Sequence, residues 1–345
     1  MAPPNARGLV VVTGGSGHIA SFCIAELLGD GWRVRATLRD LARADEVRSS
    51  IGKIAGNAET IEFASADLNS DAGWAEALAG ADYVLHIASP VVSLSPKSDE
   101  DIIRPARDGA IRVLKAARDA GVKRVVMTSS IAAIAYGRAM RAEPFTERDW
   151  TDATNSKDTT AYERSKTIAE RAAWTLQKTE GGGLELVTVN PALVLGPVLG
   201  ADFSPSLEAI RKLLDRSVPA LPNIGFSIVD VRDVARLHLL AMTAPGVNGE
   251  RFIASASFHW MKDIARMLKK EMGEAARNVP SLSIPDFAVR LYAIFDPVLR
   301  SRLFELGKRR LVSSDKARTK LGWTTRPVRD TILDAASSLK SQGLV

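Results

Sequence analysis

The chain has 345 residues, of which 46% are hydrophobic and 25% charged, and its formal net charge is +6. This composition is too apolar for a disordered chain and is ordinary for an enzyme with one large domain or two closely packed ones. No apolar run reaches the ~18 residues of a membrane span, and the dispersed basic residues form no stripe of the kind that binds nucleic acid. We therefore expect neither a membrane nor a nucleic acid as a partner.

The only cysteine is Cys23, and the four histidines are scattered. A single cysteine cannot form an internal disulfide, which favours a reducing, cytoplasmic location. The histidines lack the short spacings of a zinc site, so we expect no metal. The segment before the first glycines contains too few apolar residues for a signal peptide.

Short apolar runs alternate with helical patterns over the first 190 residues. The predicted strands cover residues 9–13, 32–37, 60–64, 82–87, 123–128 and 184–189, and the clearest helices cover residues 19–28, 111–120 and 162–179. Several strands are rich in Val and Ile without polar alternation, as in parallel sheets that are covered on both faces. The pattern predicts an α/β fold built on a Rossmann-type, doubly wound parallel sheet.

The pattern loosens after residue 190, where prolines interrupt the segment up to residue 224. We expect one helix near residues 206–215, a strand followed by a helix over residues 227–244, a strand over residues 250–254, and mostly helices beyond residue 259. We therefore assign residues 1–190, with about 226–256, to a dinucleotide-binding domain. Residues 191–225 and 257–345 are assigned to a smaller, mainly helical, C-terminal substrate-binding lobe.

A glycine-rich loop follows the first predicted strand and opens a helix. Its residues are Thr13, Gly14, Gly15, Ser16, Gly17, His18 and Ile19. Gly14 permits a sharp turn, and Gly17 lets backbone N–H groups approach a pyrophosphate at the positive end of the helix. The alternative is a tight turn without a ligand, but the position after the first strand favours a dinucleotide site.

The end of the second predicted strand carries the choice of cofactor. An NAD-specific site usually has an acidic residue there, whereas a basic residue suits the 2′-phosphate of NADP. Arg39, with Arg43 nearby, therefore favours NADP (NADPH) over NAD. Asp40 leaves a second possibility, because it could pair with Arg39 or face the ribose itself.

Two further strand ends offer contacts to the cofactor. Asp67 and Leu68 follow the third strand, where a carboxylate can accept a hydrogen bond from the adenine amine. Asp67 could equally cap the next helix. Ala88 and Ser89 follow the fourth strand and are small enough for a flat cofactor to pass, and His86 fits a packed strand residue better than a catalyst.

Tyr162 and Lys166 are four residues apart in a predicted helix and so lie on one of its faces. A neighbouring ammonium is expected to lower the pKa of the phenol toward the range of a general acid or base. Ser129 and Ser130 follow the fifth strand and offer hydroxyls to a substrate carbonyl. Ser, Tyr and Lys in this order and context are far more specific than Tyr-x-x-x-Lys alone.

Taken together, the motifs resemble those of an extended short-chain dehydrogenase/reductase. The resemblance is to the branch of dihydroflavonol reductase and cinnamoyl-CoA reductase and its microbial aldehyde reductase relatives. It is carried by Thr-Gly-Gly-Ser-Gly-His-Ile-Ala, Val-Arg-Ala-Thr-Leu-Arg-Asp, Thr-Ser-Ser, Tyr-x-x-x-Lys and Val-Asn-Pro-Ala-Leu-Val-Leu-Gly-Pro, and it extends over nearly the whole chain.

The resemblance also implies roles for individual residues. Tyr162 would be the proton donor, and Lys166 would tune it and bind the nicotinamide ribose. Ser130 rather than Ser129 would contact the carbonyl, and the neighbours of Pro191 would contact the nicotinamide carboxamide.

The sequence departs from both plant enzymes. Ala135 stands where dihydroflavonol reductases usually carry the asparagine that holds the flavonoid, and residues 160–166 differ from the cinnamoyl-CoA reductase motif. We therefore expect an NADPH-dependent reductase of bulky apolar or aromatic aldehydes and ketones, acting as a monomer or homodimer. The alternatives are a sugar-nucleotide epimerase, a hydroxysteroid-type dehydrogenase and a non-enzymatic regulator that senses a dinucleotide.

The substrate pocket is expected to take its walls from the loops after the fourth, fifth and sixth strands. These loops are mainly apolar, and their side chains are Val91, Val92, Leu94, Ile131, Ile134, Tyr136, Met140, Leu193 and Phe203. Residues 291–299 are also apolar but too short for a membrane anchor, so we expect a buried helix or a further pocket wall there.

Overall fold

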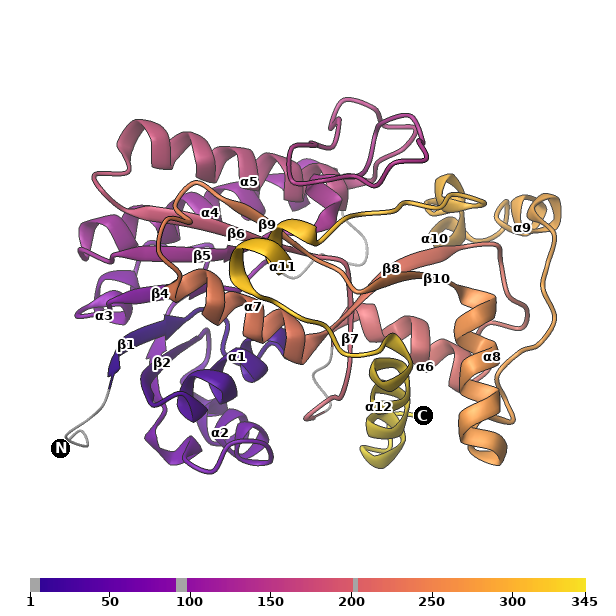
Figure 1. Ribbon diagram of the computed structural model, residues 1–345, viewed down its shortest axis with the longest axis horizontal. Coiled ribbons are helices and arrows are strands. Elements are labelled where there is room, and N and C mark those ends of the chain that lie inside the picture. Colours follow the sequence, from indigo (N-terminus) through magenta and orange to yellow (C-terminus); the bar gives the residue numbers. More distant parts are fainter. Residues whose placement is uncertain (1–6, 91–97, 201–203) are drawn as a thin grey trace.

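A seven-stranded sheet forms the centre of the fold (Figure 1). The computed structural model describes residues 7–90, 98–200 and 204–345. Every strand runs parallel to its neighbours, in the order β3-β2-β1-β4-β5-β6-β9. The strands are β1 (Arg7–Val12), β2 (Trp32–Leu38), β3 (Glu62–Ser65), β4 (Tyr83–His86), β5 (Arg124–Thr128), β6 (Glu185–Pro191) and β9 (Arg251–Ala254). The predicted parallel sheet is therefore confirmed.

Helices cover both faces of this sheet, as the apolar strands require (Figure 1). Successive strand residues point to opposite faces, so Val10 and Val12 of β1 pack in one core layer and Val11 packs in the other. One layer contains α1 (His18–Gly29), α2 (Ala44–Gly52) and α7 (Val231–Thr243). The other contains α3 (Trp74–Leu78), α4 (Glu100–Asp119) and α5 (Ala161–Glu180).

A second, three-stranded sheet forms the smaller lobe. Its order is β10-β8-β7, with β7 (Leu193–Leu195) parallel and β10 (Ser257–Trp260) antiparallel to β8 (Gly225–Asp230). The sequence pattern groups residues 226–230 with the larger domain, but in the structure they pair within the small sheet. The next elements do belong with the large sheet: β9 is one of its strands, and α7 packs on one of its faces. The sequence pattern predicts neither β7 nor β10.

The remaining helices complete the smaller lobe and its links. They are α6 (Glu208–Leu214), α8 (Met261–Met272), α9 (Asp286–Tyr292), α10 (Pro297–Arg300), α11 (Asp315–Leu321) and α12 (Val328–Ser341). Short 3-10 helices lie in the connections: η1 (Leu41–Arg43), η2 (Ala58–Thr60), η3 (Ile131–Ala133), η4 (Pro205–Leu207), η5 (Gly273–Ala276) and η6 (Leu303–Glu305). Within the described ranges, no helix is long and apolar enough to cross a bilayer.

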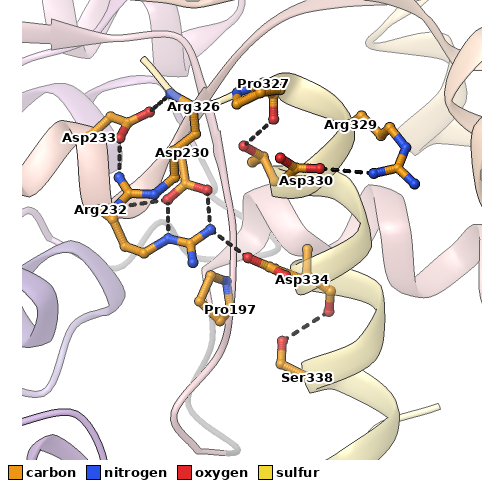
Figure 2. Close-up of polar contacts among 12 residues, drawn as sticks. Pro197, Asp230, Arg232, Asp233, Arg326, Pro327, Arg329, Asp330, Asp334 and Ser338 are labelled. Atoms are coloured by element: carbon orange, nitrogen blue, oxygen red, sulfur yellow. Dashed lines mark hydrogen bonds and ion pairs between the residues drawn. The ribbon is translucent and has the colours of Figure 1, made fainter. Parts of the chain in front are cut away.

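An ionic cluster that we call the Asp230 joint (Asp230, Arg232 and Asp334) ties the two lobes together (Figure 2). Asp230 ends β8 and caps α7 by accepting the backbone N–H of Arg232 at 2.8 Å. The Arg232 guanidinium donates to Asp230 at 2.7 Å and to Asp334 of α12 at 2.6 Å. Ser338, one turn further along α12, accepts the backbone N–H of Val198 at 2.9 Å. The last helix is thereby fixed to the corner where the two sheets meet.

Candidate active site

The candidate site lies at the carboxyl ends of the parallel strands. The chain moves outward from β1 to β2 and β3 and then crosses back to β4 on the other side of β1. Such a reversal opens a crevice beyond the strand ends, which is where open α/β sheets bind their ligands. The glycine-rich loop follows β1, Ala88 and Ser89 follow β4, Ser130 follows β5, and Pro191 ends β6.

The glycine-rich loop has no room for side chains at two of its positions. Gly14 has a φ of +68°, and a Cβ there would lie 3.1 Å from Ala88. A Cβ on Gly15 would lie 2.7 Å from the Cβ of Ala36. Gly17 is the N-cap of α1, and no side chain caps this helix. The first N–H groups of α1 therefore stay available to a phosphate, and the loop fits the pyrophosphate of a dinucleotide.

Thr13 links the loop to the end of β4 through its hydroxyl. The Thr13 Oγ1 accepts the backbone N–H groups of Ile87 and Ala88, each at 3.0 Å, and lies 2.9 Å from Nδ1 of His86. With two N–H donors already directed at it, the hydroxyl donates its proton to Nδ1, so the His86 proton is on Nε2. Burial, with the charge of Lys166, lowers the pKa of His86 to about 3, which agrees with a packed, neutral histidine.

The basic residues after β2 differ in their partners. Asp40 accepts the backbone N–H of Ala42 at 2.9 Å and so caps η1. It is therefore not paired with Arg39, which is exposed and makes no hydrogen bond or ion pair within the described residues. Arg43 pairs with Glu46 at 3.0 Å.

Asp67 forms a local turn at the end of β3. Its Oδ1 accepts the backbone N–H of Asn69 at 2.9 Å and the side-chain Nδ2 at 3.1 Å. The N-cap of α3 is Gly73, so Asp67 does not cap that helix. Leu68 is buried, and a Cβ on Gly109 would lie 3.1 Å from it.

The two serines after β5 have different surroundings. Ser129 is buried, and its hydroxyl donates to Glu170 at 2.5 Å. The Ser130 hydroxyl accepts the N–H of Ala132 at 3.1 Å and lies 3.5 Å from the carbonyl oxygen of Pro191. It is also close enough to the Tyr162 phenol to lower the pKa of that group. Ser130 is therefore the serine that faces Tyr162.

Tyr162 lies in the first turn of α5, whose start is set by a capping box. The Thr160 hydroxyl accepts the N–H of Tyr162 at 3.2 Å, while Glu163 accepts the N–H of Thr160 at 2.7 Å. One turn later, Lys166 Nζ donates to the Ser89 hydroxyl at 3.1 Å and lies 5.9 Å from the centroid of the Tyr162 ring. Tyr162, Lys166 and Ser89 line one cleft, with three residues of α4: Asp101, Ile102 and Ala106. The sequence does not predict this α4 wall.

Burial controls the protonation of both residues. Burial raises the pKa of Tyr162, and the hydrogen bond with Ser130 offsets this only in part. The predicted lowering is therefore wrong, because burial is the largest cause of the shift and Lys166 is not among the groups that offset it. Burial also lowers the pKa of Lys166 to about 8, against the opposing charge of Glu170.

The predicted pocket walls are only partly brought together. Ile134 is fully buried in a core cluster, and Met140 is exposed. Tyr136 meets Phe304 of η6 edge to face, with ring centroids 6.3 Å apart. Leu193 lies in β7, and Ile131 opens η3. The other predicted wall residues, Val91, Val92, Leu94 and Phe203, lie outside the described residues.

Residues 291–299 differ from their prediction. We expected a buried helix or a pocket wall, but Leu291 is 62% exposed and Phe295 is 81% exposed. They belong to a group of exposed apolar side chains, with Leu282, Phe287, Tyr292 and Ile294. Only Val289 of α9 is buried.

Two residues near Tyr162 were missed by sequence reasoning. Glu170 continues the spacing of four from Tyr162 and Lys166, and this periodicity could have identified it. Arg302 lies 3.4 Å from Glu163, and its charge acts on the Tyr162 phenol. No local pattern marks Arg302, because its partners are more than a hundred residues away in the chain.

The chain is similar to known proteins over most of its length. The sequence pattern of the NAD dependent epimerase/dehydratase family matches residues 10–254. Cinnamoyl-CoA reductase CAD2 of Medicago truncatula is 32% identical over 99% of this chain and 98% of its own length. Dihydroflavonol 4-reductase of Zea mays is 30% identical over 79% of this chain and 77% of its own length.

Solved structures are similar to the chain as well. The yeast methylglyoxal/isovaleraldehyde reductase Gre2, complexed with NADPH, is similar with a TM-score of 0.79 and 26% identity, over 98% of this chain and 100% of that one. Vestitone reductase from alfalfa (Medicago sativa L.) has a TM-score of 0.75 and 25% identity, over 98% of this chain and 100% of that one. The chain therefore belongs to the NAD dependent epimerase/dehydratase family and is an oxidoreductase with a Rossmann-type cofactor domain.

Proposed function

We propose that the chain is an NADPH-dependent reductase that converts bulky apolar or aromatic aldehydes and ketones to alcohols. The observation that carries this proposal is the convergence of Ser130, Tyr162 and Lys166. The Ser130 hydroxyl faces the Tyr162 phenol, and Lys166 lines the same cleft as Tyr162. These side chains are the groups needed to bind a carbonyl oxygen, protonate it and hold the cofactor ribose.

Bound NADPH supplies the hydride that adds to the carbonyl carbon. The Ser130 hydroxyl donates a hydrogen bond to the carbonyl oxygen and so favours the negative charge that develops there. Tyr162 then gives its proton to that oxygen, which completes the alcohol. Because burial raises the pKa of Tyr162, the phenol is protonated at neutral pH and so holds the proton that the product alcohol needs. The ammonium of Lys166 stabilises the phenolate that is left.

The choice of NADPH over NADH rests on Arg39. Its guanidinium is exposed and makes no hydrogen bond or ion pair within the residues described, so its charge is not neutralised by a carboxylate. Arg43 and Ser16 line a second cleft beside the glycine-rich loop. A 2′-phosphate at this end of the site would meet these basic groups. The similarity to the NADPH-bound yeast reductase supports the same cofactor.

The substrate class rests on the mainly apolar sequence of the loops after β5 and β6. The pair of Tyr136 and Phe304 places aromatic surface between the η3 segment and the C-terminal lobe. Such a surface binds mainly through apolar area removed from water, roughly 25 cal/mol per Å² before the costs of association. We therefore expect aryl aldehydes, aryl ketones and α-dicarbonyl compounds to be better substrates than sugars or coenzyme A thioesters.

The test is NADPH consumption against a panel of aromatic aldehydes, diketones, flavanonols and acyl-CoA thioesters. The decisive pair is an aldehyde and its matched CoA thioester. A higher kcat/KM for the aldehyde is the expected result, and a clear preference for the thioester would restore the cinnamoyl-CoA reductase interpretation. The Tyr162→Phe variant is measured beside the wild type to show that turnover belongs to this site.

A further inference from the structure

A carboxylate is buried directly behind the candidate site. Glu170 of α5 is fully buried and follows Tyr162 and Lys166 on the same helix face. Its oxygens accept hydrogen bonds from four donors: Ser129 Oγ at 2.5 Å, Asn190 Nδ2 at 2.8 Å, Trp174 Nε1 at 3.3 Å and Arg251 Nε at 2.6 Å. A carboxylate with this many partners is held in a single orientation.

The amide of Asn190 carries this orientation to the candidate catalytic serine. Its Nδ2 donates both to Glu170 and to the backbone carbonyl oxygen of Ser130, the latter at 3.2 Å. Two acceptors facing one amide end require the NH₂ group there. Ser129, the residue before Ser130, also donates to Glu170. The backbone of Ser130 is therefore fixed on both sides by groups that depend on one carboxylate.

Arg251 compensates the charge of Glu170 without reaching the cleft. Its side chain is 8% exposed, and its Nη1 donates to the carbonyl oxygens of Glu147 and Asp149 at 2.8 Å each. The guanidinium also stacks on Trp150, 3.7 Å from the ring centroid. Burying an ion pair costs desolvation free energy that an apolar pair would avoid, so stability alone is a weak reason for this pair.

Glu170 also acts on Lys166. The groups that face this ammonium are Tyr162 and Glu170 on α5, His86 on β4, the Ser89 hydroxyl after β4, and Asp101 of α4 in the same cleft. His86 is neutral, and burial favours the uncharged amine. Glu170 opposes burial and raises the pKa of Lys166.

We propose that Glu170 is a positioning residue, which orients Ser130 through Ser129 and Asn190. We call these residues, with Arg251, the Glu170 network. The inference rests on the proposed roles of Ser130, Tyr162 and Lys166. The same carboxylate also acts on Lys166, and two variants distinguish the two effects.

Glu170→Gln removes the charge and keeps the shape of the side chain. We expect kcat to fall by about tenfold or more, with little change in the Kd of NADPH. In the plot of kcat against pH, the fall on the basic side, near pH 8, should move to lower pH. Asn190→Ala removes the link to Ser130 and one donor to Glu170 but leaves the charge of Glu170 in place, so kcat is expected to fall while the basic side of the plot stays in place.

The matched control is Glu185→Gln. Glu185 pairs with Arg124 at 2.5 Å, and both begin the strands that end near the site, β6 and β5. Loss of that pair is expected to lower stability without changing kcat or its pH profile. If Glu170→Gln behaves like this control, the proposal is overturned. If Glu170→Gln does not fold, the double variant Glu170→Gln/Arg251→Met, which leaves no unpaired charge, is measured in the same way.

A readout without turnover separates this inference from the proposed function. Lys166 is acetylated with a low dose of acetic anhydride across a pH series, and its labelling is followed by peptide mass spectrometry. We expect a midpoint near pH 8 in the wild type, a lower midpoint in Glu170→Gln, and unchanged midpoints in Asn190→Ala and Glu185→Gln. An unmoved midpoint in Glu170→Gln contradicts the effect on Lys166, even where no carbonyl compound is reduced.

Discussion

The Glu170 network and the Asp230 joint use the same chemistry in different surroundings. Each centres on a fully buried carboxylate that pairs with an arginine. Around Glu170 the arginine is also buried, with 8% of its side chain exposed, and every partner belongs to the large sheet or the elements beside it. In the joint, Arg232 is 26% exposed and Asp334 is 44% exposed.

The two clusters therefore serve different purposes. The Glu170 network is isolated from water and fixes atoms beside Tyr162, whereas water reaches the joint, which fastens α12 to the corner of the two sheets. We expect substitutions of Tyr162 and Arg39, which are in no buried ion pair within the described part of the chain, to change kcat or cofactor affinity with little change in Tm. Substitutions in the joint are expected to change Tm and leave kcat unchanged.

The largest expected effect is that of Tyr162→Phe. Loss of the phenolic proton should lower kcat by at least ~100-fold, because general acid catalysis contributes about that much or more. NADPH affinity and Tm should stay close to those of the wild type. Steady-state turnover, fluorescence titration with NADPH and thermal unfolding measure the three quantities. A variant that keeps substantial turnover would remove Tyr162 from its role as the acid.

The next effect concerns the charge at Arg39. A charge-assisted hydrogen bond to a phosphate contributes roughly 1.5–3 kcal/mol, so Arg39→Ala should weaken NADPH binding by about 10- to 150-fold. NADH, which lacks the phosphate, should bind almost unchanged and is the internal control. Equal weakening of both cofactors, measured by titration, would mean that Arg39 has only a structural role.

Within the joint, Arg232→Met leaves the buried Asp230 carboxylate without its guanidinium partner. The backbone N–H of residue 232 still reaches Asp230, so we expect a loss of about 2 kcal/mol and a fall in Tm of roughly 4–8 °C. Turnover of the folded enzyme should not change. A loss of kcat at a temperature where the variant is fully folded would show that the joint also shapes the site.

The smallest effect is the pH dependence of that loss. Burial alone would raise the pKa of Asp230, but the hydrogen bonds from Arg232 outweigh it and hold the pKa below its ordinary value. The stabilisation is therefore complete above the unfolded-state pKa of about 4 and is lost as pH falls through the lower native value. The difference in Tm between wild type and Arg232→Met should be largest near neutral pH and should shrink below about pH 4. A constant difference would assign the stabilisation to packing of the arginine stem.

How well the role of a residue could be predicted depended on how far apart in the chain its partners lie. The glycine-rich loop and the spacing of Tyr162 and Lys166 obey local rules, because a turn or a helix face depends on neighbours in the chain. Asn190 and Arg251 could not be assigned in this way, since they meet Glu170 only after three strands and a helix have packed together. The residues on either side of them in the sequence predict only strands.

The errors have physical causes too. The pKa of Tyr162 was predicted from its charged neighbour, whereas burial controls it. Leu291 and Phe295 were expected to be covered because they are apolar, but α9 turns only Val289 inward. The strands β7 and β10 were missed because β7 has only three residues and lies in the segment that prolines interrupt, and β10, unlike β9, has no fully buried residue.

The place of α12 in the chain has a consequence for synthesis. All seven strands of the large sheet lie before residue 255, so the cofactor domain can begin to fold while the rest is still being translated. Asp334 and Ser338 leave the ribosome after every strand of the large sheet, and only then can they contact Arg232 and the backbone of Val198. The nascent chain can thus form its large sheet first, and α12 joins the two lobes only once it has itself been translated.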